Sequence, residues 1–327
     1  MTQTTTRSLA ALCQQLDLDP HAPDAPALDA ETTFSLKVPS HFLAQIQPGD
    51  WQDPLLRQIL PLACEKQVSV GFSKDPVGDQ AALLQPGLIQ KYAHRALLIA
   101  SPKCDVHCRY CFRRHYPYEQ ATQPHWRAAL QTLDQRPDIT ELILSGGDPL
   151  SLSEGSFLTL LDHIDALTHI KILRVHSRTP VVAPDRIKAS WRQRLAQFSK
   201  KVVWVVHCNH AQELSAQTRQ LFQQCQAAGM VLLNQSVLLK HINDSVSAQA
   251  TLNEALFDQG VLPYYCHRLD PVEGGGHFQV SDHQAWQLWQ ALRQTLPGYL
   301  VPKLVKELPG EPYKTWIGLD HPPTEAL

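Results

Sequence analysis

Apolar residues along the chain fall into short continuous runs that are separated by helix-like segments. Six runs rich in Val, Ile, Leu and aromatic residues are predicted as strands: 95–101, 141–147, 172–177, 202–207, 231–239 and 263–269. Helices are predicted between them where apolar residues recur at every third or fourth position: 157–167, 186–198, 214–229 and 248–260. From the second run onward the strands recur roughly every 30 residues, the period of a βα unit. Runs this apolar are typical of parallel strands covered on both faces.

Six βα units are too few for the common eight-stranded barrel. The pattern therefore predicts an α/β fold built as an open, partial (βα)6 TIM-like barrel over residues 91–280. Residues 1–90 lack the βα rhythm and are predicted as a mostly helical N-terminal cap. Residues 281–327 are predicted as one helix, at 283–296, followed by a short irregular tail whose two apolar stretches could pair as short strands beside the barrel.

Composition and charge exclude several classes of protein. A chain of 327 residues with 43% hydrophobic content can bury a large core, so a disordered or fibrous protein is excluded. The formal net charge of -2 gives no overall basic field for nucleic acid or an anionic membrane. The sequence shows neither a secretory h-region nor a run of about 18 apolar residues, which favours a cytoplasmic location.

Three of the eight cysteines lie close together in the stretch CDVHCRYCFRR, directly after the first predicted strand. Cys104, Cys108 and Cys111 can bind three corners of a [4Fe–4S] cluster and leave the fourth iron open for a substrate. A zinc site completed by His107 or His115, or a coincidental cluster, is less favoured, because zinc sites usually show paired CxxC motifs or a distant His pair. The other cysteines are scattered and are interpreted as small buried residues: Cys13, Cys64, Cys208, Cys225 and Cys266.

Polar motifs accompany all six predicted strands. In chain order they are CDVHCRYCFRR, SGGDPL, HSRTP, HCNH, NQS within the fifth strand, and Asp270 with GGGH after the sixth. The loops that follow the strands of a parallel barrel gather at one face. These motifs are therefore predicted to form one shared site.

The CxxxCxxC motif, with Tyr110 before its last cysteine, resembles the radical S-adenosylmethionine superfamily, whose members bind and reductively cleave that cofactor at the open iron. This resemblance implies that the partial barrel is of the radical S-adenosylmethionine type. SGGDP resembles the superfamily's glycine-rich motif, which contacts the methionine amino group of the cofactor. Glycine is expected in it because a Cβ would block close approach of the backbone to the ligand. Its residues in this chain are Ser145, Gly146, Gly147 and Asp148.

A second resemblance, to lysine 2,3-aminomutases, covers most of the chain. The similar segments are CRYCFRR, LSGGDPL, VHSRTPVVAPDRI, VHCNH, LLNQSVLLKHIND and PGYLVPKLVKELPGEPYK. FSLKVPSHFLAQIQPGDWQDPLLRQIL and DPVGD resemble the bacterial members that make (R)-β-lysine for modifying elongation factor P. The resemblance implies an isomerase that converts (S)-α-lysine to (R)-β-lysine with a [4Fe–4S] cluster, S-adenosyl-L-methionine and pyridoxal 5'-phosphate. It also implies an electron donor such as flavodoxin or ferredoxin, and a functional link to elongation factor P and its lysyl ligase.

The same resemblance implies roles for individual residues. Lys314 falls where the family holds pyridoxal phosphate covalently, and Arg113 matches the arginine that pairs with the substrate carboxylate. Asp270 and Glu307 match the acidic pair that receives the ε-ammonium of lysine. The remaining implied contacts are, for adenosylmethionine, His207 and Gln235 and, for pyridoxal phosphate, Lys91 and Arg95.

The chain departs from the larger aminomutases in two ways. They carry Asp where Glu307 stands, and they end in a cysteine-rich zinc tail. No structural zinc is expected here, and a homo-oligomer like the family's tetramer is left open. Two facing carboxylates would repel an acidic side chain, so glutamate is a disfavoured substrate. The alternatives are an aminomutase for another amino acid, a radical enzyme that uses adenosylmethionine alone, and a non-catalytic zinc or iron–sulfur protein.

Overall fold

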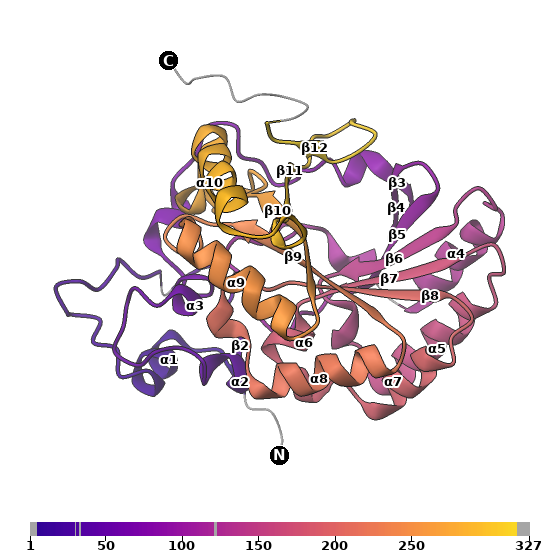
Figure 1. Ribbon diagram of the computed structural model, residues 1–327, viewed down its shortest axis with the longest axis horizontal. Coiled ribbons are helices and arrows are strands. Elements are labelled where there is room, and N and C mark those ends of the chain that lie inside the picture. Colours follow the sequence, from indigo (N-terminus) through magenta and orange to yellow (C-terminus); the bar gives the residue numbers. More distant parts are fainter. Residues whose placement is uncertain (1–4, 30, 33, 121–122, 319–327) are drawn as a thin grey trace.

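The computed structural model describes residues 5–29, 31–32, 34–120 and 123–318 (Figure 1). Within these residues, ten strands form one sheet in the order β12-β11-β10-β9-β8-β7-β6-β5-β4-β3. The central strands all run parallel: β5 (Arg95–Ser101), β6 (Glu141–Gly146), β7 (Ile172–Ser177), β8 (Lys201–Val206), β9 (Val231–Leu238), β10 (Leu262–Arg268) and β11 (Lys303–Lys306). All six strands predicted from the apolar runs are among them. An α/β fold with a large sheet is therefore confirmed.

Antiparallel strands lie at both edges of this sheet. β4 (Leu88–Tyr92) pairs with β5, and β3 (Leu83–Gln85) pairs with β4. At the opposite edge β12 (Thr315–Trp316) pairs with β11, so the two apolar stretches of the tail pair as predicted. β11 also continues the parallel order beside β10, which the pattern did not indicate because this strand has only four residues. The end of the predicted tail, residues 319–327, lies outside the described residues.

Helices connect the parallel strands and lie along the outer side of the sheet (Figure 1). Their bounds are α4 (Gln123–Asp134), α5 (Glu154–Asp165), α6 (Thr179–Val182), α7 (Ala189–Ala196), α8 (Ala216–Ala227), α9 (Val246–Asp258) and α10 (Asp282–Thr295). Several begin at a serine whose side chain accepts a backbone N–H of the first turn: Ser153, Ser215, Ser245 and Ser281. Gly229 and Gly260 follow α8 and α9 with φ angles of 81° and 75°, the left-handed conformation that ends a helix.

Short 3₁₀ turns complete the connections. They are η1 (Ala63–Lys66), η2 (Gln80–Ala82), η3 (Tyr118–Gln120), η4 (Pro149–Ser151), η5 (Pro184–Arg186), η6 (Ala211–Glu213), η7 (Gly276–Phe278) and η8 (Gly298–Leu300). Among the described residues, no helix is long and apolar enough to cross a membrane.

The main hydrophobic core lies between the sheet and the surrounding helices. Leu142 and Leu144 of β6 belong to the same buried cluster as Phe157 of α5 and Trp191 of α7. The rings of Phe157 and Trp191 meet with centroids 4.6 Å apart. Because these apolar side chains occupy the outer face of the sheet, the inner face and the carboxyl ends of the strands are left for polar residues.

The N-terminal segment packs against the loop that carries the clustered cysteines. It contains β1 (Thr5–Thr6), α1 (Leu9–Gln15), β2 (Val38–Pro39), α2 (Ser40–Leu43) and α3 (Pro54–Arg57), so it is less helical than predicted. Frequent prolines account for this, because proline breaks a helix interior. The buried cluster of this segment includes Val106 from the cysteine loop and Val182 from α6. The segment therefore supports the cysteine loop from outside the sheet.

Candidate active site

One large cavity opens at the carboxyl ends of the parallel strands and has a volume of about 980 Å³. This volume lies at the upper end of the range for small-molecule sites, so there is room for more than one ligand. Every residue that the sequence analysis assigned to the site lines this cavity: Lys91, Arg95, Cys104, Cys108, Cys111, Arg113, Ser145, Gly146, Gly147, Asp148, His207, Gln235, Asp270, Glu307 and Lys314. Their placement is consistent with one shared site, while their individual roles stay predictions.

The three clustered cysteines lie on the loop between β5 and α4. A backbone hydrogen bond of 3.1 Å from Cys111 N to Cys108 O shapes the loop. Burial raises the pKa of the Cys104 thiol well above its usual value and that of Cys111 to about 11. Any metal that binds these thiols must therefore displace protons. In the described part of the chain, no group of three or more His, Cys, Asp or Glu side chains is arranged closely enough to hold a single metal ion.

The two glycines of SGGDP allow β6 to approach the cysteine loop. Gly146 has a φ of 125°, and a Cβ on it would lie 2.6 Å from the backbone oxygen of Ser101. A Cβ on Gly147 would lie 2.6 Å from the backbone oxygen of Lys103. The close packing of β6 against this loop is therefore one reason for glycine at both positions, and the predicted approach of the backbone to a ligand stays a prediction.

Asp148 holds the loops around the cavity together. Its Oδ1 accepts from Leu150 N at 2.9 Å and from Ser177 Oγ at 2.7 Å. Its Oδ2 accepts from Arg178 N at 2.8 Å and from Thr179 N at 3.1 Å. With both oxygens bonded to the protein, the carboxylate joins the loops after β6 and β7 to each other.

Lys314 lies in a cluster of charged residues on the side of the cavity that the C-terminal tail forms. Its Nζ donates to Glu307 Oε2 at 2.5 Å, while Tyr92 Oη donates to Glu307 Oε1 at 2.7 Å. Lys91 Nζ lies 3.6 Å from the same Oε1. Burial opposes ionisation of Glu307, but Lys314 and Lys91 hold its pKa below the usual value.

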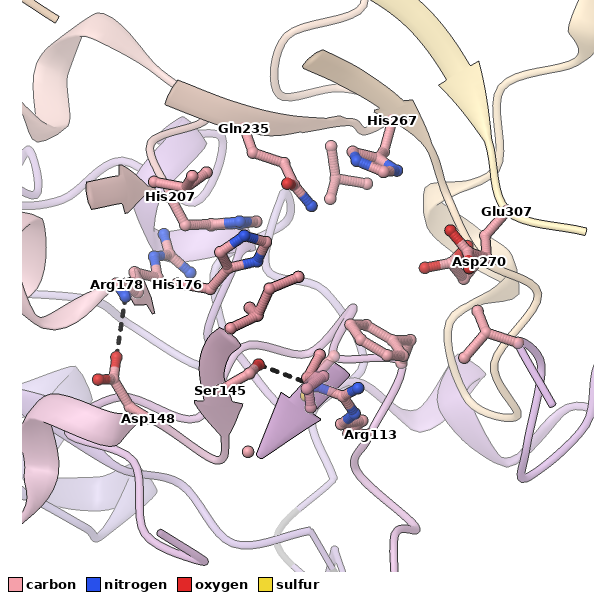
Figure 2. A pocket seen from close by; sticks show the side chains of 18 of the residues that line it. Arg113, Ser145, Asp148, His176, Arg178, His207, Gln235, His267, Asp270 and Glu307 are labelled. Carbon is pink, nitrogen blue, oxygen red and sulfur yellow. Dashed lines mark hydrogen bonds between the residues drawn. The ribbon is translucent and has the colours of Figure 1, made fainter. Parts of the chain in front are cut away.

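Asp270 lies beside Glu307 on the same side of the cavity (Figure 2). Burial raises the pKa of this carboxyl to about 7, with Lys314 acting against the rise and the negative charge of Glu307 adding to it. The two acids of the predicted pair are therefore unequal. At neutral pH Glu307 is ionised, whereas Asp270 is close to half protonated.

Arg113 is buried beside Ser145, on a different side of the cavity from the acidic pair (Figure 2). Its Nε lies 2.7 Å from Asp79 Oδ2, and its Nη1 donates to Ser145 Oγ at 3.0 Å. Asp79 Oδ1 lies 2.7 Å from Lys91 Nζ. Burial raises the pKa of Asp79, but Arg113 and Lys91 outweigh it and lower that pKa to about 2. Asp79 therefore links the residue predicted for the substrate carboxylate to the Lys314 cluster.

Arg95 is less enclosed than the other predicted cations. Its side chain is 42% exposed, and its Nε lies 3.7 Å from Glu141 Oε2. The guanidinium stacks over Tyr92 at 5.5 Å from the ring centroid.

Three histidines and Gln235 line another side of the cavity (Figure 2). His207 Nε2 contacts Tyr110 Oη at 2.9 Å. Burial, reinforced by Arg178, lowers the pKa of His207 to about 3, so the ring is neutral at pH 7. His176 Nε2 and His267 Nε2 are buried without a hydrogen-bond partner among the described residues.

Several residues of the cavity were not identified from the sequence. His176 and Arg178 belong to HSRTP, the motif after the third strand, so their location was indicated but their individual roles were not. Tyr92 and His267 lie within β4 and β10 and carried no motif of their own. Asp79 lies in DPVGD, which was noted only as a resemblance, and no spacing rule connects it to Arg113.

Comparisons with known proteins agree with this arrangement. A family model described as a 4Fe-4S single cluster domain matches residues 94–179. L-lysine 2,3-aminomutase of Escherichia coli (strain K12) is 43% identical over 310 residues, which cover 94% of this chain and 90% of that protein. The Haemophilus influenzae protein of the same name is 40% identical, covering 88% of this chain and 86% of its own. The Clostridium subterminale protein of that name is 31% identical, covering 86% of this chain and 68% of its own.

Proposed function

Because this chain belongs to the L-lysine 2,3-aminomutase family and is an isomerase of the radical S-adenosylmethionine type, we propose that it converts L-lysine to (R)-β-lysine. The amino group moves from C2 to C3 of the substrate in this reaction. We further propose that the product is used to modify elongation factor P. That part rests on the resemblance of the N-terminal segments to bacterial enzymes of this pathway.

The observation that carries the proposal is that one cavity is lined both by Lys314 and by Cys104, Cys108 and Cys111. A lysine that binds a carbonyl cofactor covalently needs a pocket with little water. Three thiols on one loop provide three ligands for a [4Fe–4S] cluster. A non-catalytic metal-binding protein would have no need for both features in one chamber.

When bound, the cluster with S-adenosyl-L-methionine supplies a radical that removes hydrogen from the substrate, and pyridoxal 5'-phosphate supplies electron delocalisation for the migrating nitrogen. Cys104, Cys108 and Cys111 would hold the cluster. The backbone of the SGGDP turn, His207 and Gln235 would hold adenosylmethionine. His207 is neutral and contacts Tyr110 through Nε2, so Nδ1 is the ring nitrogen that remains for a ligand.

Lys314 would hold pyridoxal phosphate, with Lys91 and Arg95 as cations for its phosphate. In the described state Lys314 Nζ donates to Glu307 Oε2 at 2.5 Å. With its nitrogen bound to the cofactor, Lys314 would no longer donate to Glu307 as a free ammonium, and Glu307 would have a carboxylate oxygen available for another cation. We propose that this cation is the ε-ammonium of the substrate, which Asp270 and Glu307 would share.

Arg113 would bind the substrate carboxylate, because a guanidinium presents a planar fork that matches a carboxylate. Asp79 and Ser145 hold this guanidinium in one orientation. With Arg113 on one side of the cavity and Asp270 and Glu307 on another, a ligand with an α-carboxylate and a distant ammonium matches these three residues (Figure 2). A ligand with an acidic side chain does not, which supports lysine over glutamate.

The N-terminal segment and the tail would close this chamber against water. We also propose that the sheet is a partial (βα)6 barrel of the radical S-adenosylmethionine type, with residues 1–90 as a cap, 91–280 as the barrel and 281–327 as the tail that carries Lys314. An electron donor such as flavodoxin or ferredoxin, the oligomeric state and the cytoplasmic location stay predictions.

The test is product analysis after anaerobic reconstitution with iron, sulfide, pyridoxal phosphate, S-adenosyl-L-methionine and a low-potential reductant. Purified enzyme would be given L-lysine, L-glutamate or L-alanine in separate reactions, and the products would be separated by chiral chromatography with mass detection. We expect (R)-β-lysine from lysine and no β-amino acid from the other two. A fully loaded enzyme that leaves lysine unchanged would refute the proposal.

Lys314→Ala, reconstituted in the same way, is the matched control. It should take up the same amount of iron and sulfide and form no β-lysine. β-Lysine formation by this variant would show that the product does not depend on the proposed cofactor lysine.

A further inference from the structure

Arg178 is a buried cation that touches one of the clustered cysteines. It is the first residue after β7 and the N-cap of α6, and its side chain is 7% exposed. Its Nη1 donates to Cys108 Sγ at 2.7 Å and to Tyr110 Oη at 2.5 Å. Arg178 also lines the cavity, and its Nε–H is buried without a partner among the described residues.

The guanidinium is fixed from its far side. Nη2 donates to Gln58 Oε1 at 2.7 Å and to Glu213 Oε2 at 3.0 Å. Gln58 and Glu213 are themselves almost completely buried. The backbone N–H of Arg178 donates to Asp148 Oδ2 at 2.8 Å, which holds the start of the side chain in place. The contact with Cys108 is therefore held by three separate parts of the chain.

Glu213 is held as firmly as Arg178. Its Oε1 accepts from Asn209 N at 3.0 Å, from His210 N at 3.1 Å and from Gln58 Nε2 at 3.1 Å. The Arg178–Glu213 pair thus sits in a region of low dielectric, where charges interact more strongly than in water. The Arg178 guanidinium contacts the Cys108 sulfur through Nη1, and the Glu213 carboxylate contacts the same guanidinium through Nη2.

Hydrogen bonds to ligand sulfurs and the net charge nearby set the reduction potential of an iron–sulfur cluster. One-electron reduction adds one negative charge to the cluster, and a cation at a ligand sulfur stabilises the more negative state. We propose that Arg178 raises the reduction potential of the cluster bound at Cys108 and that Glu213 offsets part of this rise. This inference rests on the proposed cluster site. The step is reduction of the cluster from its 2+ to its 1+ state, with the electron supplied by an external low-potential donor.

The functional consequence is a compromise between two requirements. A higher potential makes the cluster easier for an electron donor to reduce, whereas a lower potential gives more driving force for cleaving adenosylmethionine. The Arg178–Glu213 pair would set the balance between these steps without touching the substrate. A pair that only stabilised the fold would need no contact with Cys108.

The test is a potentiometric titration of the reconstituted cluster, followed by electron paramagnetic resonance of the 1+ state, without substrate. Three variants are compared with the parent: Arg178→Gln, Glu213→Gln and the double variant. We expect Arg178→Gln to lower the reduction equilibrium constant at least tenfold, which is about 59 mV for a one-electron couple. Glu213→Gln should shift the potential upward, and the double variant should fall between the two single variants.

Arg194→Gln is the matched control, because Arg194 pairs with Asp162 and Asp165 on α5, away from the cavity. Its potential should equal that of the parent. If Arg178→Gln does not fold, the upward shift in Glu213→Gln decides the question, and its absence overturns the inference. Shifts that are absent, or that have the same sign in both single variants, would overturn the inference.

Iron and sulfide analysis separates this result from the proposed function. A parent protein that binds no [4Fe–4S] cluster at Cys104, Cys108 and Cys111 would overturn both proposals. A parent that binds the cluster and makes β-lysine, while the variants keep its potential, would overturn only the role of Arg178.

Discussion

Lysine binding is expected to depend on pH through Asp270. Burial raises the pKa of this carboxyl to about 7 in the ligand-free protein, and the groups that act on it are Lys314, Glu307, Lys91 and Asp79. An ammonium group placed beside Asp270 favours its ionised form. Lysine should therefore bind the protein with ionised Asp270, and binding below pH 7 must include the cost of removing a proton.

The size of the effect follows from this pKa. The ionised fraction of a carboxyl with a pKa of about 7 rises from about 0.1 at pH 6 to about 0.9 at pH 8, and each pKa unit is worth about 1.4 kcal/mol. The affinity for L-lysine should thus increase at least tenfold between pH 6 and pH 8, because a cofactor bound to Lys314 would remove a cation that lowers this pKa. Asp270→Asn should lose this increase and bind lysine more weakly above pH 7.

The dissociation constant can be measured by anaerobic calorimetry on cofactor-loaded enzyme without a reductant, so that no turnover occurs. L-2-Aminohexanoate, which lacks the side-chain ammonium, reports the pH dependence of the α-amino group alone. The difference in pH dependence between the dissociation constants of the two ligands therefore gives the contribution of Asp270. An equal pH slope for both ligands, or a slope retained in Asp270→Asn, would refute the reasoning.

The same raised pKa has a consequence for stability. Asp270 stays protonated in the folded state over a pH range in which it is ionised in the unfolded chain, so the folded state binds more protons there. Its contribution therefore lowers the stability as pH rises from roughly 4 to 7. Asp270→Asn should melt at a higher temperature than the parent at pH 8, with the difference vanishing near pH 4.

Three further changes test the site and its scaffold. Lys314→Ala should abolish borohydride-stable labelling with pyridoxal phosphate and leave the iron content unchanged. Cys108→Ala should abolish cleavage of S-adenosyl-L-methionine, measured as 5'-deoxyadenosine, whereas Cys225→Ala, in the core on α8, should retain it. Gly147→Ala should lower the free energy of unfolding by about 1–3 kcal/mol, because the new methyl group meets backbone at 2.6 Å. Gly155→Ala, with nothing within 4 Å of the new Cβ, should leave the melting temperature unchanged or raise it.

The parallel strands could be predicted because their residues are apolar on both faces and recur with the βα period. The cysteine motif could be recognised because its three residues lie within one loop, where spacing along the chain determines proximity. The location of the shared site followed from the rule that loops after parallel strands meet at one face. The first two predictions depend on local pattern alone, and the third adds a rule about parallel sheets.

Residues that act through long-range contacts could not be predicted in the same way. Asp79 joins Arg113 and Lys91, but it lies in an irregular segment whose path depends on packing of the whole chain. Arg178 lies in the HSRTP motif, but the orientation of its side chain toward Cys108 depends on Glu213 and Gln58, which come from different parts of the sequence. The raised pKa of Asp270 likewise arises from burial, which a sequence motif does not encode.

The distance in sequence between the cysteine loop and Lys314 bears on how the protein matures in the cell. The loop ends its synthesis about 200 residues before the tail is made, and at roughly 5–20 residues per second a ribosome needs on the order of ten seconds or longer for that stretch. For most of this time β10, β11 and β12 do not yet exist, so the side of the cavity that carries Asp270, Glu307 and Lys314 is missing. The complete cavity therefore forms only after residue 314 has been synthesised, so a ligand that needs Lys314 can bind only later than one that needs the cysteine loop alone.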